Sequence, residues 1–112
     1  MNKTLKYSIM YYKTDEKINV PIGILFSDET GYHKYFREAE NLERLIKEND
    51  TVSVSSIKIL TNSIKEEVES LEKIDINDYI KYYISDFFFS KVRTHETNKF
   101  RKLINKICKL YF

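Results

Sequence analysis

The feature that most constrains the fold is a nine-residue alternation of apolar and other side chains over residues 18–26, INVPIGILF. The alternating apolar residues are Ile18, Val20, Ile22, Ile24 and Phe26. This period of two is typical of a strand with one buried face. Another apolar run, residues 5–12, precedes it, and the polar residues 14–17 separate the two runs. The pattern therefore predicts an antiparallel hairpin.

Two residues inside the second run predict a distortion of its strand. Pro21 has no amide hydrogen to donate, and Gly23 has no side chain to pack. Within strands, such residues mark an edge, a bulge or a bend. We expect the strand to bend near Pro21, with its first half paired to the first strand and its second half mainly to a third strand over residues 32–37.

The rest of the chain alternates between helical and extended patterns. Residues 51–60 fit either a strand or the start of a helix, but the apolar spacing of three and four over residues 51–73 favours one long helix, capped by Asp50 or Thr51. The other expected elements are a helix of about three turns after Glu38, a short helix within 74–84 capped by Asn77 or Asp78, a strand over 86–92, and a final helix capped by Thr94 or Thr97. The order predicts a single α+β domain, residues 1–112, with a three- or four-stranded mainly antiparallel sheet packed against two or three helices.

The alternation also assigns side chains to the two faces of the hairpin. The residues expected toward the core are Tyr7, Ile9, Tyr11, Ile22, Ile24 and Phe26. The opposite face is expected to carry Tyr12, with Met10 and Lys6. If helices cover one face only, Tyr12 lies on an exposed aromatic surface of the kind enriched at protein interfaces.

Charge is distributed unevenly along the chain, although the formal net charge is only +2. Residues 28–90 carry eight basic and fourteen acidic residues, whereas residues 91–112 carry seven basic residues and one acid. The basic residues singled out as a candidate binding site are Arg93, Lys99, Arg101, Lys102, Lys106 and Lys109. Such a tail docks either on the acidic helices of its own chain, with Lys99, Lys102 and Lys106 near Glu66, Glu69 and Glu72, or on an external anion.

Catalytic and metal-binding patterns are not recognisable. His33 and His95 are isolated from each other in sequence, and Cys108 lacks the basic surroundings of a nucleophile. The carboxylates at Glu66, Glu67, Glu69 and Glu72 are spread around a helix, as on a solubilising face, rather than gathered as metal ligands. We expect no catalytic residue, metal or cofactor. One cysteine leaves no internal disulfide, and no apolar run has the length of a membrane span or signal peptide, so a reducing cytoplasm is expected.

Both ends of the chain resemble a bacterial family of small proteins of unknown function. The opening YSIMYY, a polar turn and then VPIGILF are similar to the family's YS-hydrophobic strand and its hydrophobic-Gly-hydrophobic run ending in LF. The ending FFFSKVRTHETNKFRKLINKI is similar to the family's closing strand, basic connector and helix. Pro21 and Tyr11 stand where the family usually has Asn and Arg. The resemblance implies a bacterial cytoplasmic protein, often encoded near HipA-type kinases of toxin–antitoxin or defence islands, and implies no activity.

These observations favour a small non-enzymatic interaction or regulatory protein that binds another protein or a second copy of itself, in a toxin–antitoxin, defence or phage counter-defence setting. The alternative is nucleic-acid binding through the basic C-terminal helix. The residues expected to bind a partner are Tyr12, Arg93, Lys99, Arg101, Lys102, Lys106 and Lys109.

Overall fold

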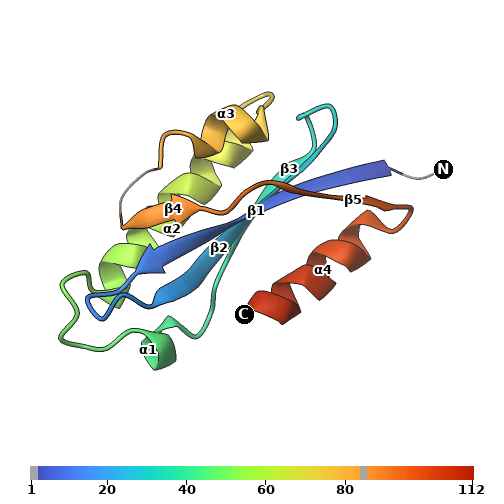
Figure 1. Ribbon diagram of the computed structural model, residues 1–112. Coiled ribbons are helices and arrows are strands. Elements are labelled where there is room, and N and C mark those ends of the chain that lie inside the picture. Colours follow the sequence, from blue (N-terminus) through green and yellow to red (C-terminus); the bar gives the residue numbers. More distant parts are fainter. Residues whose placement is uncertain (1–2, 84–85) are drawn as a thin grey trace.

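The fold is α+β, with one mainly antiparallel sheet that carries helices on both faces (Figure 1). The computed structural model describes residues 3–83 and 86–112, so Ile84, within the expected short helix of residues 74–84, lies outside the described residues. The strands are β1 (Lys3–Lys13), β2 (Asn19–Asp28), β3 (Lys34–Glu38), β4 (Phe87–Phe89) and β5 (Arg93–Thr97). The helices are α1 (Leu42–Leu45), α2 (Val54–Ser70), α3 (Ile76–Ile80) and α4 (Phe100–Tyr111). No helix in the described ranges is long and apolar enough to cross a membrane.

The hairpin predicted from the alternation is confirmed, because β1 and β2 pair antiparallel from Leu5 opposite Asp28 to Lys13 opposite Asn19. Its turn is closed by the side chain of Thr14, whose Oγ1 accepts a hydrogen bond from the Ile18 amide at 3.1 Å. Lys17 adopts the left-handed conformation, with φ 68°. Local backbone and hydroxyl groups thus define the conformation of the turn.

The expected distortion at Pro21 is a β-bulge. Met10 lies opposite Gly23 and Tyr11 opposite Pro21, so Ile22 has no partner on β1. The extra residue reverses the facing of the strand. Ile22 therefore lies on the face opposite Ile24, and its expected place beside Ile24 is wrong. The expected division of pairing is also wrong, since β2 pairs with β1 along its whole length and with β3 from Gly23 to Ser27.

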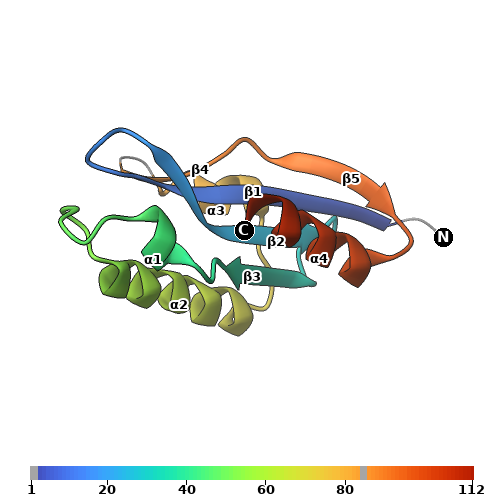
Figure 2. The same ribbon diagram turned by 90° about the horizontal axis from the view of Figure 1, so that it is seen from below.

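Gly23 is required by the packing of β3 on β2. A Cβ at this position would overlap the ring of Phe36, which lies across the glycine. Phe36 is only 2% exposed, although β3 is the last strand of the sheet on that side. Figure 2 shows α2 running alongside β3, so the helix covers this end of the sheet.

On the other side of the sheet, two short strands pair with β1 in place of the one expected over residues 86–92. β4 lies beside Met10–Tyr12, and β5 lies beside Lys3–Tyr7. Between them three residues, 90–92, stand opposite two on β1. Ser8 and Ser90 bridge the break: Ser8 Oγ donates to the Ser90 carbonyl at 2.5 Å, and Ser90 Oγ accepts from the Ile9 amide at 3.0 Å. The expected basic connector is therefore partly a strand.

The long helix is confirmed as α2, but its cap is Ser53, whose Oγ accepts from the Ser56 amide at 3.1 Å, rather than Asp50 or Thr51. The helix expected after Glu38 is a single turn, α1. The short helix α3 is capped by Asp75 rather than by Asn77 or Asp78. The N-cap of α4 is Lys99, with no side-chain cap bond, rather than Thr94 or Thr97, although Thr97 Oγ1 accepts from the Lys99 amide at 3.0 Å.

The bulged sheet separates two hydrophobic cores. One core joins Met10, Tyr12 and Ile22 to the buried sides of α1, α2 and α3. The other joins Tyr7, Ile9 and Phe26 to Ile104 and Ile107 of α4. Since helices cover both faces, the expectation of an uncovered sheet face is wrong.

Candidate partner-binding surface

Helix α4 is positioned by a stripe of apolar side chains repeated every three or four residues. Ile104 and Ile107 are 2% and 3% exposed and pack on the centre of the sheet. Phe100, Leu103 and Tyr111 flank them and are only partly buried. Burial of such side chains is worth roughly 1.5–3 kcal/mol each, so this stripe is what holds α4 on the sheet.

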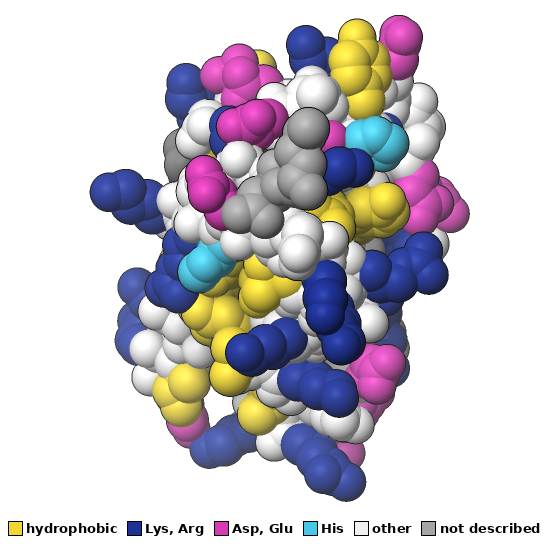
Figure 3. All heavy atoms as spheres, turned by 90° about the vertical axis from the view of Figure 1, so that its right-hand side faces the viewer, with side chains coloured by type: hydrophobic (Ala, Val, Ile, Leu, Met, Phe, Trp, Pro, Cys, Tyr) yellow, Lys and Arg dark blue, Asp and Glu magenta, His cyan; other side chains and the backbone are white. Residues whose placement is uncertain are grey.

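The charged residues on the outer side of α4 are all basic. No acid occurs between residues 98 and 112, and the exposed cations are Lys99, Arg101, Lys102, Lys106 and Lys109. Figure 3 shows Lys and Arg side chains gathered over the half of the view where α4 lies, with apolar side chains visible between them. We call this outer side the basic face.

The basic face is not neutralised by the acidic helix of the same chain. Glu66 and Glu69 lie on α2, which packs on the other face of the sheet from α4 (Figures 1 and 2). The ion pairs among the described residues are Lys47–Glu16, Lys58–Glu43 and Lys81–Asp78. None of them includes a residue of α4. The expected approach of Lys99, Lys102 and Lys106 to Glu66, Glu69 and Glu72 is therefore wrong.

On the β5 side, α4 is closed by polar and aromatic contacts. Arg93 Nη1 donates to Tyr111 Oη at 2.5 Å, and the guanidinium lies 5.9 Å from the centre of that ring. His95 stacks on Tyr7 with ring centroids 5.6 Å apart. Arg93, expected as a free binding residue, thus ties the end of α4 to β5.

On the β3 side, the contact with α4 is hollow. A depression of about 780 Å³ lies at the C-terminal end of α4, and its apolar lining consists of Pro21, Ala39, Leu45, Cys108, Tyr111 and Phe112. Arg37 joins it to a hollow of about 110 Å³ beside Arg101. Tyr35 and Phe100 continue to a third of about 170 Å³. These hollows follow α4 from end to end, and together we call them the α4–β3 groove.

Exposed apolar side chains surround the deepest part of the groove. Leu45 is 53% exposed and Phe112 is 39% exposed. The charged residues lining this part are Arg37, Arg44, Lys109, Glu38 and Glu40. Large apolar side chains clustered beside a basic rim are typical of a surface that binds another molecule.

Sequence reasoning singled out Arg101 and Lys109 of the groove but missed most of its other lining residues, because the groove is assembled from segments far apart in the chain. Arg37 and Tyr35 share a face of β3, and that part of the signal is present in their spacing. Leu45 belongs to the segment expected to form a three-turn helix after Glu38, but α1 ends there and leaves the side chain exposed.

The candidate catalytic residues are not brought together. His33 and Cys108 line hollows at different ends of the groove, and His95 lies on β5, on the other side of α4. Burial raises the pKa of the Cys108 thiol, which favours the protonated form over the nucleophilic thiolate. Groups of three or more potential metal ligands are absent from the described part of the chain.

Tyr12 belongs to the interior and not to a binding surface. It is 1% exposed, and its hydroxyl donates to Asp50. Burial and this bond raise the pKa of Tyr12 to about 12, while the hydroxyl lowers the pKa of Asp50. The expectation that Tyr12 faces a partner is wrong because α1–α3 cover its face.

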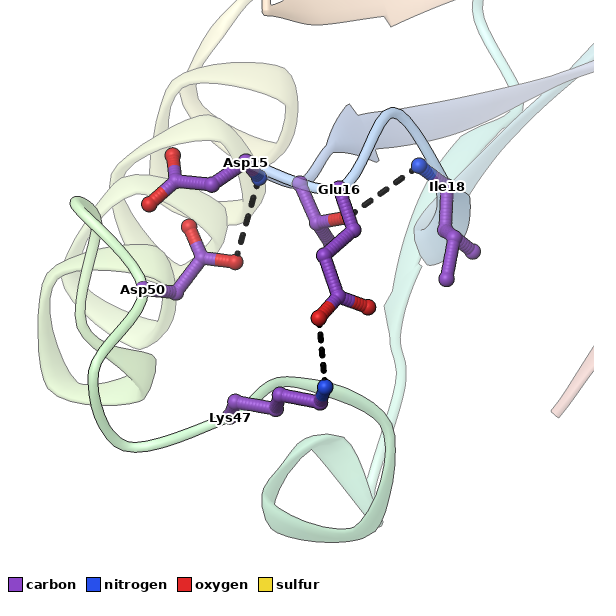
Figure 4. A network of polar contacts seen from close by, with 6 residues as sticks. Asp15, Glu16, Ile18, Lys47 and Asp50 are labelled. Carbon is purple, nitrogen blue, oxygen red and sulfur yellow. Dashed lines mark hydrogen bonds and ion pairs between the residues drawn. The ribbon is translucent and has the colours of Figure 1, made fainter.

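The carboxylate of Asp50 also ties the β1–β2 hairpin turn to the loop before α2. Asp50 accepts from the Asp15 amide, and Lys47 pairs with Glu16 at 2.5 Å (Figure 4). The Asp15 carboxylate accepts in turn from the Thr51 amide. The acidic residues here serve the fold by joining two loops.

Comparison with family models, curated proteins and solved structures finds no match to this chain.

Proposed function

We propose that this chain is a non-enzymatic interaction protein that binds a partner protein through the basic face of α4 and the α4–β3 groove. The observation that carries the proposal is the juxtaposition of an open, largely apolar groove with cations that form no ion pair with any residue the structure describes. Elsewhere on the molecule, Lys47 and Lys58 are matched by carboxylates of the same chain. Charges left unmatched beside exposed Leu45 and Phe112 favour an external partner.

The biological setting that we propose is a bacterial toxin–antitoxin, defence or phage counter-defence system in the cytoplasm. It is supported by the sequence resemblance at the two ends of the chain and by no feature of the groove. The setting therefore stands or falls separately from the binding surface.

Affinity purification from the native host tests the binding function. We expect a partner to be captured by the unaltered chain and lost with Lys102→Glu/Lys106→Glu, which reverses the basic face. The matched control is Lys65→Glu/Lys81→Glu, which changes exposed lysines near α2 and α3 and should keep the partner. Equal capture by both variants, or catalytic turnover by the pure chain, would contradict the proposal.

A nucleic-acid-binding function is the second candidate, favoured by one observation. Tyr35 is 42% exposed between Arg37 and Lys34, and aromatic rings beside cations suit stacked bases of a single strand. This candidate predicts binding to generic single-stranded DNA or RNA that weakens steeply with salt, because each neutralised phosphate releases counterions. Lack of filter binding at low salt would exclude it.

A further inference from the structure

We propose that the α4–β3 groove receives a short acidic segment of the partner protein, which inserts bulky apolar side chains beside Leu45 and Phe112. This inference rests on the proposed function and specifies the chemistry of the partner. It is drawn from the shape of the groove, the charges around it and the state of the neighbouring strand.

The largest of the three hollows indicates that the occupant carries apolar side chains. Its volume of about 780 Å³ is within the range that accommodates several side chains of a ligand. Pro21, Ala39 and Leu45 form one wall, and Tyr111 and Phe112 form the other. Apolar walls of this kind bind leucine- or phenylalanine-like side chains better than the phosphates of a nucleic acid.

The acidic part comes from the balance of charges that are free to act. Arg37, Arg44, Arg101 and Lys109 line the groove, and none of them forms an ion pair with a residue in the described ranges. The nearby acid Glu43 is directed away, because it pairs with Lys58 of α2 at 2.5 Å.

A further acid on the groove, Asp28, is hydrogen-bonded within its own turn. Its carboxylate accepts from the Thr30 hydroxyl at 2.7 Å and the Gly31 amide at 2.9 Å. Those donors are neutral, so Asp28 keeps its charge. With Glu38 and Glu40 it gives three carboxylates against five cations that line the hollows, Lys3, Arg37, Arg44, Arg101 and Lys109. Charge complementarity therefore favours an acidic occupant.

The binding mode follows from the state of β3. Strand addition requires an open edge with free backbone groups. Phe36, at the middle of β3, is 2% exposed and α2 runs alongside, so this edge is closed. The segment is consequently held by its side chains in the groove and not by pairing with β3.

An unbiased selection tests the chemistry. Random peptides of about 12 residues, long enough to follow the roughly 18 Å length of α4, are displayed on phage and selected against the full chain. Peptides that also bind Leu45→Asp/Arg44→Glu protein are discarded. We expect the remaining peptides to be rich in Asp and Glu and to contain Leu, Ile, Phe or Trp.

A selected peptide is then measured by fluorescence polarisation. Its affinity should fall about tenfold or more, at least 1.4 kcal/mol, with Leu45→Asp/Arg44→Glu. It should stay unchanged with the control Ile59→Asp/Lys65→Glu, which alters an exposed apolar residue and a cation on α2. Because Cys108 is the single cysteine and lines the groove, saturating peptide should slow its alkylation by iodoacetamide several-fold.

Several outcomes would overturn the inference. These are neutral or basic survivors, the absence of any groove-dependent peptide, unchanged alkylation of Cys108, tighter binding of an oligothymidylate probe, or self-association of the chain abolished by Leu45→Asp. If a host partner is nevertheless lost with Lys102→Glu/Lys106→Glu, the proposed function survives and only the acidic-segment inference fails.

Discussion

The two faces of the sheet are built from the same two central strands but are finished differently. On the face of α1–α3, three helices and their loops cover the strands, Ser53 and Asp75 cap α2 and α3, and Lys47 and Lys58 pair with carboxylates. On the face of α4, a single helix buries Ile104 and Ile107 and leaves one flank hollow. The first face is completed by the chain itself, while the second leaves both apolar surface and positive charge unmatched. The chain therefore closes one face itself and leaves the other partly open, and the open face is where we propose that a partner binds.

The largest effect should come from the completed face. Ile57→Ala removes a fully buried side chain of α2 and should destabilise the protein by roughly 3–5 kcal/mol, because the surrounding helices and strands collapse poorly into the cavity. Ile104→Ala on α4 should cost less, about 2–3 kcal/mol, since the adjacent groove lets the helix resettle. Urea unfolding of both variants measures the difference. Equal losses would mean that the two faces pack alike.

The next effect concerns the strand pair shared by both faces. Gly23→Ala forces the Phe36 ring away from β2 and should cost about 1–3 kcal/mol. Phe36→Leu should cost less when combined with Gly23→Ala than alone, because the smaller side chain gives the new methyl group room. A thermal double-mutant cycle measures this coupling, and strict additivity would show that the ring does not restrict position 23.

A smaller effect is expected from the polar contacts of the completed face. Tyr12→Phe removes the hydroxyl that donates to Asp50 and should cost about 1 kcal/mol. Since the folded protein lowers the pKa of Asp50, that carboxylate contributes stability above its ordinary pKa of about 4, and the contribution disappears as pH falls through the folded value. Urea unfolding at neutral and acid pH should therefore show a weaker acid dependence in Tyr12→Phe. An unchanged dependence would assign the acid sensitivity to other carboxylates.

The smallest effect on stability should come from the basic face. Lys102→Glu/Lys106→Glu changes exposed residues without ion pairs among the described residues, so the free energy of unfolding should shift by less than about 0.5 kcal/mol. Partner binding should nevertheless be lost. Calorimetric unfolding beside the binding assay tests this, and a large drop in melting temperature with binding intact would show that the lysines serve the fold.

Elements with a repeated apolar pattern were predictable from the sequence. The alternation around Ile24 predicted the hairpin, Pro21 the distortion, and the spacing of Ile57, Ile64 and Val68 the long helix. In each case the pattern reflects burial of one side of a locally regular chain, which needs no knowledge of distant partners.

Features that depend on the meeting of distant segments were not predictable. Strand β5 is polar and largely exposed, and it is held by backbone bonds to β1, so its sequence has no apolar period. The face that each helix covers decided the burial of Tyr12 and the separation of the basic and acidic helices. The groove likewise requires β3, α1 and α4 together, and no local pattern contains it.

The one-residue offset between β4 and β5 also disfavours aggregation of the protein through strand pairing between copies of the chain. Exposed strand edges act as templates on which further chains add and aggregates grow. A foreign strand in register with β4 would be out of register with β5, since residues 90–92 insert an extra step between them. An intruding chain therefore finds only three or five residues to pair with at a time. Because α2 closes the opposite edge, the α4–β3 groove can stay open without making the sheet a nucleus for strand-by-strand polymerisation.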